Sequence, residues 1–147
     1  MRIETSDLIS LLREVDKKAT PQRLAICEEV FSQQDHPSVE LIYSSLKNKY
    51  PTISVATIYK TLQLLKEKGY LQEVGIQDAS VRYDPNHNLH LNLVCTKCGE
   101  IRDAIPASLP QMWSALISDL GISPQNQLLN IYYTCKKCDK TDTMPNA

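Results

Sequence analysis

The chain has 147 residues, of which 42% are hydrophobic and 22% charged, proportions that fit a globular protein with a true core. Residues 1–18 are charged throughout, unlike a signal peptide, and no apolar run approaches the ~18 residues that a membrane span needs, so we expect a cytoplasmic protein. The net charge of −1 does not suggest a nucleic-acid partner, but residues 47–68 hold five lysines against one glutamate, a local charge of +4.

Four helical patterns fill the first half of the chain. Residues 4–15 place three leucines and a valine on one face, the spacing of an amphipathic helix. Thr20 is the expected N-cap of a second helix, with Pro21 at its first position. A third helix is predicted to begin near Ser38, in a region that Pro51 ends.

The fourth helix is predicted over residues 54–68, with Ser54 as its cap and Gly69 as its stop. We expect its buried stripe to consist of Val55, Ile58, Leu62 and Leu65. Residues 70–84 then form two short alternating segments around a polar turn, which predicts a β-hairpin.

Helices followed by a two-stranded hairpin describe a winged helix-turn-helix, whose second helix would be the one predicted over residues 54–68. Polar side chains on that helix could reach base edges and phosphates in a major groove. They are Thr57, Tyr59, Lys60, Thr61 and Gln63. The pattern alone leaves an alternative open, a structural three-helix bundle with a solvated polar face.

A second, smaller α/β unit with its own core is predicted after the sequence YDPNHN, in which a proline and two asparagines mark a hinge. Strands are expected over residues 89–95, 99–105 and 127–135, and a helix over residues 107–121. The predicted fold class is therefore α+β, with two domains.

Two C-x-x-C pairs, Cys95 with Cys98 and Cys135 with Cys138, are separated by 36 residues, and each follows a predicted strand. Thiols stay reduced in a cytoplasmic protein, so paired cysteines favour a metal over disulfides. The spacing suits a closed structural Zn²⁺ site with four thiolates, and a redox C-x-x-C would normally stand alone. Cys27 lies within the second predicted helix and is interpreted as a core residue.

If four thiolates fill the zinc, three polar residues near the first cysteine pair require another explanation. They are His87, His90 and Asp103. A second metal site must therefore be considered, and an open catalytic metal site that includes His90 and Asp103 is an alternative. Against an enzyme, no nucleophile–base pair or substrate-pocket motif is found. A zinc-ribbon interaction module without a DNA role is a further alternative.

The chain resembles the ferric uptake regulator (Fur) family of bacterial metalloregulators, most closely its peroxide-sensing, PerR-type branch. The motifs that carry this resemblance are TPQR (20–23), HPS (36–38), SVATIYKTL (54–62), DASVRYD (78–84), CTKCGEI (95–101) and the last C-x-x-C. The resemblance implies a homodimer with an N-terminal winged-helix DNA-binding domain over residues 1–84, a hinge at 85–90 and a C-terminal α/β dimerisation domain over 91–147 that holds a Cys₄ zinc.

The resemblance also implies a regulatory metal between the domains. Its ligands, carried over by position, are His36, Asp84, His90, Asn92 and Asp103. Mixed nitrogen and oxygen donors suit Fe²⁺ or Mn²⁺. In the peroxide-sensing branch, bound Fe²⁺ reacts with hydrogen peroxide and a ligand histidine is oxidised, after which DNA is released. The alternative is a repressor that senses iron, manganese or zinc availability without peroxide chemistry.

This chain departs from the family pattern at Asn92, where relatives usually carry a histidine, so metal identity and affinity are open and His87 could substitute. No histidine occurs after His90, so the family's accessory metal site is not expected. For contact with a double-stranded DNA operator, the resemblance points to Arg23, Ser54, Thr57, Tyr59 and Lys60.

Overall fold

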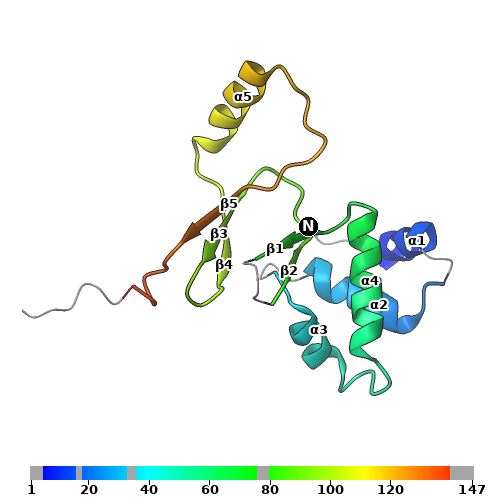
Figure 1. Ribbon diagram of the computed structural model, residues 1–147. Coiled ribbons are helices and arrows are strands. Elements are labelled where there is room, and N and C mark those ends of the chain that lie inside the picture. The colour runs from blue at the N-terminus through cyan, green and yellow to red at the C-terminus, as the bar shows by residue number, and fades with distance from the viewer. Residues whose placement is uncertain (1–4, 16–17, 33–35, 76–79, 140–147) are drawn as a thin grey trace, which may run out of the picture. The chain divides into compact units, whose positions relative to one another are not determined.

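The computed structural model describes residues 5–15, 18–32, 36–75 and 80–139, which form two compact units (Figure 1). The first unit runs to Val74 and takes in Ser80–Asn86, and the second takes in Gly75 and the chain from His87 onward. The predicted α+β class is confirmed. No helix in the described ranges is long and apolar enough to cross a membrane.

Four helices make up most of the first unit. They are α1 (Thr5–Val15), α2 (Pro21–Ser32), α3 (Val39–Leu46) and α4 (Val55–Glu67). The predicted caps are confirmed, because the side chains of Ser38 and Ser54 accept hydrogen bonds from the backbone N–H groups three residues later. Thr20 Oγ1 likewise accepts from the N–H of Arg23 at 3.4 Å. Gly69 ends α4 with a φ of 77°, a conformation that glycine adopts without strain.

The core of this unit lies where the four helices meet. Leu12, Ile26, Ile42, Ile58 and Leu62 are fully buried there. Burying each such side chain contributes roughly 1.5–3 kcal/mol before the loss of conformational entropy is counted. The core therefore fixes which face of α4 remains exposed.

Two predictions for α4 are wrong. Val55 is 42% exposed, because it lies in the first turn, beyond the core. Thr61 is 1% exposed and therefore cannot contact DNA. Its hydroxyl donates a 2.8 Å hydrogen bond to the carbonyl of Thr57, which allows the side chain to be buried without an unpaired donor.

The predicted hairpin is present, with β1 (Gln72–Val74) paired antiparallel to β2 (Arg82–Asp84). The centre of its polar turn, residues 76–79, lies outside the described residues. An ion pair of 2.7 Å joins Lys66 of α4 to Glu73 of β1. Helix α4 and the β1–β2 hairpin, the wing of the winged helix, are thus connected on the surface of the first unit.

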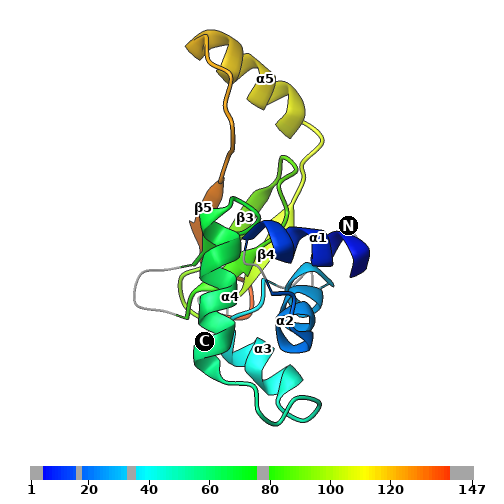
Figure 2. The same ribbon diagram turned by 90° about the vertical axis from the view of Figure 1, so that its right-hand side faces the viewer.

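The second unit is a three-stranded sheet with one helix, as predicted. Its elements are β3 (Leu91–Cys95), β4 (Ile101–Ala104), α5 (Leu109–Leu120) and β5 (Asn130–Tyr133). The strand order is β4-β3-β5, with β4 antiparallel and β5 parallel to the central strand (Figure 2). A parallel pairing requires a crossover, and α5 lies in the connection between β4 and β5.

The prediction that this unit has its own core is wrong for a single chain. Val94 and Leu109 are its buried hydrophobic residues in the described ranges, apart from two cysteines. Large apolar side chains of α5, among them Met112, Leu116 and Leu120, are instead exposed. Within one chain, the cysteine cluster must therefore contribute much of the stability of this unit.

Candidate metal centres and DNA-binding face

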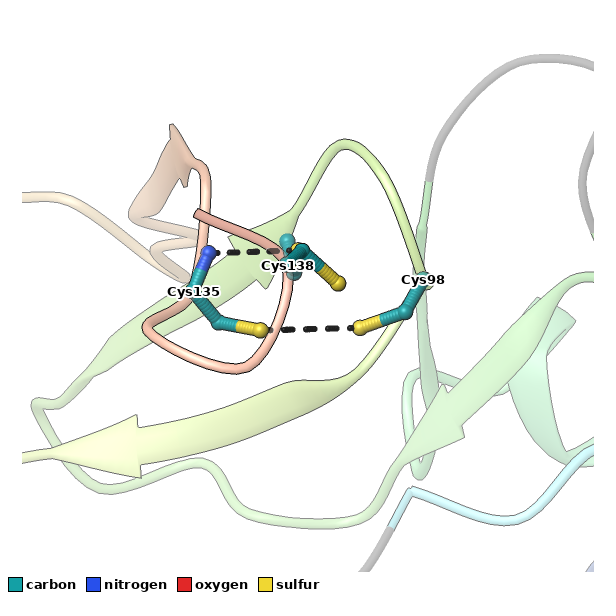
Figure 3. A group of neighbouring side chains, drawn as sticks. Cys98, Cys135 and Cys138 are labelled. Atoms are coloured by element: carbon teal, nitrogen blue, oxygen red, sulfur yellow. Dashed lines mark hydrogen bonds between the residues drawn. The ribbon is translucent and has the colours of Figure 1, made fainter. Parts of the chain in front are cut away.

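The four paired cysteines converge at one end of the second unit, with all their sulfur atoms within 4.8 Å of one another. Cys95 ends β3 and Cys135 follows β5, so the parallel pairing of these two strands brings the cysteine pairs together. Figure 3 shows the sulfur atoms of Cys98 and Cys135 facing each other, 3.8 Å apart. Gly99 has a φ of 72°, which the turn after the first pair requires. Four convergent sulfurs fit a closed tetrathiolate zinc site.

The sulfur environment favours metal binding. Hydrogen bonds from the backbone N–H groups of Cys135 and Cys98 lower the pKa of the Cys95 thiol to about 6. Hydrogen bonds with Cys135 and Cys98 raise the pKa of Cys138 to about 12. The N–H of Glu100 lowers the pKa of Cys98, but its contact with Cys95 and burial outweigh that effect and the net shift is upward. The Cys95 thiolate is thus preformed, and a cation is needed to stabilise the thiolates of Cys98 and Cys138.

A lysine beside the cluster is paired with a carboxylate. Lys137 lies within the second C-x-x-C pair and contacts Glu100, at 3.3 Å between Nζ and Oε1. The pKa of this lysine is raised by that hydrogen bond and by the charge of Glu100. Lys137 therefore interacts electrostatically both with the carboxylate of Glu100 and with the sulfur atoms of Cys135 and Cys98.

In the first unit, His36 and Asp84 form a buried pair, with 3.7 Å between Nε2 and Oδ2. The other oxygen of Asp84 accepts a 2.7 Å hydrogen bond from the N–H of Asn86, which fixes the carboxylate in place. An imidazole and a carboxylate are thereby held together away from solvent.

The backbone around His36 is held in an uncommon conformation. Its φ is 48°, a left-handed value that non-glycine residues adopt only where neighbouring structure holds them. Arg82 donates to the His36 carbonyl at 3.5 Å, and the N–H of Tyr83 donates to the Pro37 carbonyl at 3.1 Å. Strand β2 therefore positions both the histidine segment and Asp84. Sequence reasoning missed Arg82, although it lies within the DASVRYD motif.

In the second unit, His90, Asn92 and Asp103 lie together. Asn92 pairs directly with Asp103 across the antiparallel strands, so both side chains project from the same face. His90 Nε2 lies 3.8 Å from Asp103 Oδ1. Nδ1 of His90 lies 2.7 Å from the Asn88 carbonyl, a contact that places the proton on Nδ1 and leaves Nε2 as the donor atom for a metal.

Asn92 is 0% exposed, and within the described part of the chain neither polar atom of its side chain has a hydrogen-bond partner. Buried amides are rarely left in this state, and a cation bound to the amide oxygen would satisfy it. His87, the other candidate for this place, is exposed, and its carbonyl accepts from Gln127 Nε2 at 3.0 Å. The burial pattern favours Asn92. Each unit thus offers imidazole and oxygen donors that fit Fe²⁺ or Mn²⁺.

Of the predicted DNA-contact residues, Tyr59 and Lys60 are exposed on α4. The Ser54 hydroxyl caps the helix and lies 2.9 Å from Thr57 Oγ1, so these two residues shape the start of α4. Arg23 donates to the Lys18 carbonyl at 3.3 Å and is partly exposed. The exposed polar face of α4 is available to a nucleic acid.

Residues 14–132 match the model of the ferric uptake regulator family. The chain is 35% identical to the peroxide-responsive repressor PerR of Staphylococcus epidermidis over 135 residues, covering 92% of this chain and 90% of that protein. It is 32% identical to the peroxide operon regulator of Bacillus subtilis, covering 95% and 96%. The crystal structure of the Campylobacter jejuni peroxide stress regulator superposes with a TM-score of 0.70 at 34% identity, covering 89% of this chain and 98% of that one.

Proposed function

Because the chain belongs to the ferric uptake regulator family, we propose that it is a metal-dependent transcriptional repressor that senses peroxide and then releases DNA. Members of this family are transcription regulators, and the chain is not an enzyme. The observation that carries the proposal is a buried histidine beside a carboxylate in each unit, His36 at 3.7 Å from Asp84 and His90 at 3.8 Å from Asp103. A cytoplasmic location follows from this role.

The proposed regulatory metal is held by His36 and Asp84 of the first unit and by His90, Asn92 and Asp103 of the second. A metal held by both units restricts their relative orientation. In a dimer, that orientation sets the distance between the two α4 helices, which must match the spacing of two half-sites on DNA. Binding of the metal therefore shifts the population toward the DNA-competent arrangement.

Peroxide sensing needs a metal that can transfer electrons. Bound Fe²⁺ would supply the redox chemistry by which H₂O₂ oxidises a ligand histidine, whereas Mn²⁺ would bind without that reaction. The imidazoles of His36 and His90 are the targets. Both rings are buried beside a carboxylate, so they would lie next to the bound iron and be shielded from solvent.

We assign the four cysteines to a structural Zn²⁺, and the exposed face of α5 to a second copy of the chain. Met112, Leu116 and Leu120 recur every four residues and form one apolar stripe. A stripe of this kind in a unit with so small a core is typical of an interface. A symmetric dimer would cover the stripe with its own copy.

Peptide mass spectrometry after limited H₂O₂ treatment tests the proposal, with Fe²⁺-loaded and Mn²⁺-loaded protein compared under low oxygen. We expect one added oxygen on the peptides that contain His36 or His90, only with iron, together with loss of DNA binding. The exposed His87 is an internal control and should remain unmodified. Absence of histidine oxidation despite full iron occupancy and intact zinc would leave a sensor of metal availability.

A further inference from the structure

Three side chains with amide or carboxylate groups form a row across the sheet of the second unit. Asn92 on the central strand pairs with Asp103 of β4 on one side and with Asn130 of β5 on the other. Directly paired positions project from the same face, and neighbouring strands lie about 4.8 Å apart. Asn130 is therefore the neighbour of Asn92 on the side away from Asp103.

The two asparagines leave polar atoms buried without partners. Both side-chain atoms of Asn92 and Oδ1 of Asn130 lack a hydrogen bond to any described residue. Leaving a buried polar group unpaired costs about 1–3 kcal/mol, so three such atoms in two residues paired across neighbouring strands require a specific physical cause. Asn92 and Asn130 are complementary, because one offers an amide donor and the other an acceptor.

The donor end of Asn130 is already committed. Its Nδ2 donates to the hydroxyl of Tyr132 at 3.4 Å, and that hydroxyl donates to the carbonyl of Gly75 at 3.3 Å. Gly75 is the residue that follows β1. This chain of hydrogen bonds fixes the orientation of the Asn130 amide, so its oxygen is the end left to face a donor.

An acceptor at Asn130 selects one of the two orientations of the Asn92 amide. Of the two polar atoms of the Asn92 amide, only Nδ2 can donate a hydrogen bond to Oδ1 of Asn130. The χ2 angle of asparagine is a soft torsion, so the Asn92 amide can rotate to make this bond. Once Nδ2 is bonded, Oδ1 of Asn92 points away from β5, toward the side of Asp103. A metal cation binds the oxygen of an amide and not its nitrogen, so this orientation is the one that ligation requires.

We propose that Asn130 is a positioning residue for the regulatory metal: its side-chain oxygen accepts a hydrogen bond from Asn92 and thereby presents Asn92 Oδ1 as a ligand. The inference rests on the regulatory site proposed above. It explains how an asparagine can replace the histidine that relatives usually carry, because a hydrogen bond to the amide N–H also strengthens the oxygen as a donor. In this proposal, the hydrogen-bonded amides of Asn92 and Asn130 together take the place of the one histidine ligand of the relatives.

A double-mutant cycle on the zinc-loaded, full-length chain tests this role. Mn²⁺ affinity is measured from the EPR signal of the free ion for the parent chain, Asn130→Leu, Asn92→Ala and the double variant. Leucine keeps the shape of asparagine but has no acceptor. We expect Asn130→Leu to weaken Mn²⁺ binding by about 10-fold or more, the typical effect of losing a partner of a ligand. In the Asn92→Ala background the same substitution should change nothing.

Gln125→Ala is the matched control, since it removes an exposed amide from the same unit and should leave Mn²⁺ affinity unchanged. Circular dichroism and zinc content check that each variant is folded, and Asn130→Ala replaces Asn130→Leu if the latter is not. Equal weakening by Asn130→Leu in both backgrounds would overturn the inference. The inference would also be overturned if Asn92→Ala left Mn²⁺ affinity unchanged while His90→Ala abolished Mn²⁺ binding. In that case the proposal of a regulatory metal site would still hold. If neither His36→Ala nor His90→Ala alters Mn²⁺ binding, the proposed function itself fails.

Discussion

Five cysteines in this chain fall into two chemical classes because of their surroundings. Burial, with a smaller contribution from the charge of Glu28, raises the pKa of Cys27 to about 12, so this thiol is unreactive at neutral pH. Backbone N–H groups lower the pKa of Cys95 to about 6. The same side chain is thus a small hydrophobic residue in α2 and, at the end of β3, a proposed metal ligand.

These pKa shifts predict how zinc binding depends on pH. Cys98 and Cys138 have raised pKa values, so zinc must displace protons from them at neutral pH and affinity should fall as pH falls. Cys95 stays deprotonated until about pH 6, and below that value its proton also competes with zinc. A plot of log affinity against pH should therefore be steeper below about pH 6 than above it.

Competition with a chromophoric chelator across this pH range measures the effect. Cys27→Ala is the control and should leave the pH profile of zinc affinity unchanged, because that thiol lies in the other unit. An unchanged slope across pH 6 would contradict the assignment of Cys95 as the preformed thiolate.

At the scale of elements, α4 is the helix that carries the proposed DNA-binding face. Its start is defined by Ser54, whose hydroxyl accepts from the N–H of Thr57 at 3.1 Å. Its end is tied to the wing by the ion pair of Lys66 with Glu73. Because that pair is partly exposed, it contributes at most about 1 kcal/mol, and the cap and the buried stripe set the position of the helix.

The cap of α4 can be tested against a serine that occupies the same position without capping. Ser54→Ala should lower the free energy of unfolding of the first unit by about 1 kcal/mol, since the N–H of Thr57 loses its side-chain acceptor. Ser108 precedes α5 but makes no side-chain cap hydrogen bond. Ser108→Ala should therefore change stability by less than about 0.5 kcal/mol.

Urea unfolding with two probes separates the units. The chain has one tryptophan, Trp113, which lies in α5, so its fluorescence follows the second unit. Helical circular dichroism follows mainly the first unit, which holds α1 to α4. Ser54→Ala should shift the dichroism transition and not the fluorescence transition. Equal shifts for the two serine variants would show that the cap is unimportant.

At the scale of the whole molecule, the two units differ in how they are stabilised. The first has a continuous hydrophobic core, and the second relies on the cysteine cluster and, as we propose, on a partner chain. Leu116→Glu should convert a dimer to monomers, because a charge would be placed in the proposed interface. Leu41→Glu is the matched control, since Leu41 on α3 is 48% exposed against 49% for Leu116. Analytical sedimentation of both zinc-loaded variants and of the parent chain measures the oligomeric state. A monomeric parent chain would refute the proposed interface.

DNA binding is a property of the charged surface and should respond to salt. Lys60→Ala should reduce the slope of log affinity against log salt concentration by about 1, because one phosphate contact is lost. Lys97, exposed beside the cysteine cluster, is the control, and its replacement by alanine should leave the slope unchanged. Fluorescence anisotropy with a duplex of random sequence and Mn²⁺-loaded protein measures both slopes. Identical slopes for the two variants would exclude α4 as the DNA-binding face.

Much of the fold follows from local chemistry that can be read along the chain. Thr20, Ser38 and Ser54 are recognisable as caps because a hydroxyl before a helical pattern satisfies N–H groups within three residues. The cysteine cluster is predictable for a similar reason, since the C-x-x-C spacing is itself the geometry of a zinc knuckle. The likeness of ordered motifs predicts the family.

By itself, the sequence determined the helices, the hairpin, the grouping of the four cysteines and the family, because these depend on neighbours within a few residues or on a motif. Only the tertiary structure decided that Thr61 is buried, that Val55 is exposed and that Asn130 stands beside Asn92. The reason is register: which residue of β5 pairs with β3 depends on how the connection over residues 96–129 packs, and no local pattern encodes that alignment. The buried amide pair, and the role we propose for it, exist only because the strands align in this way.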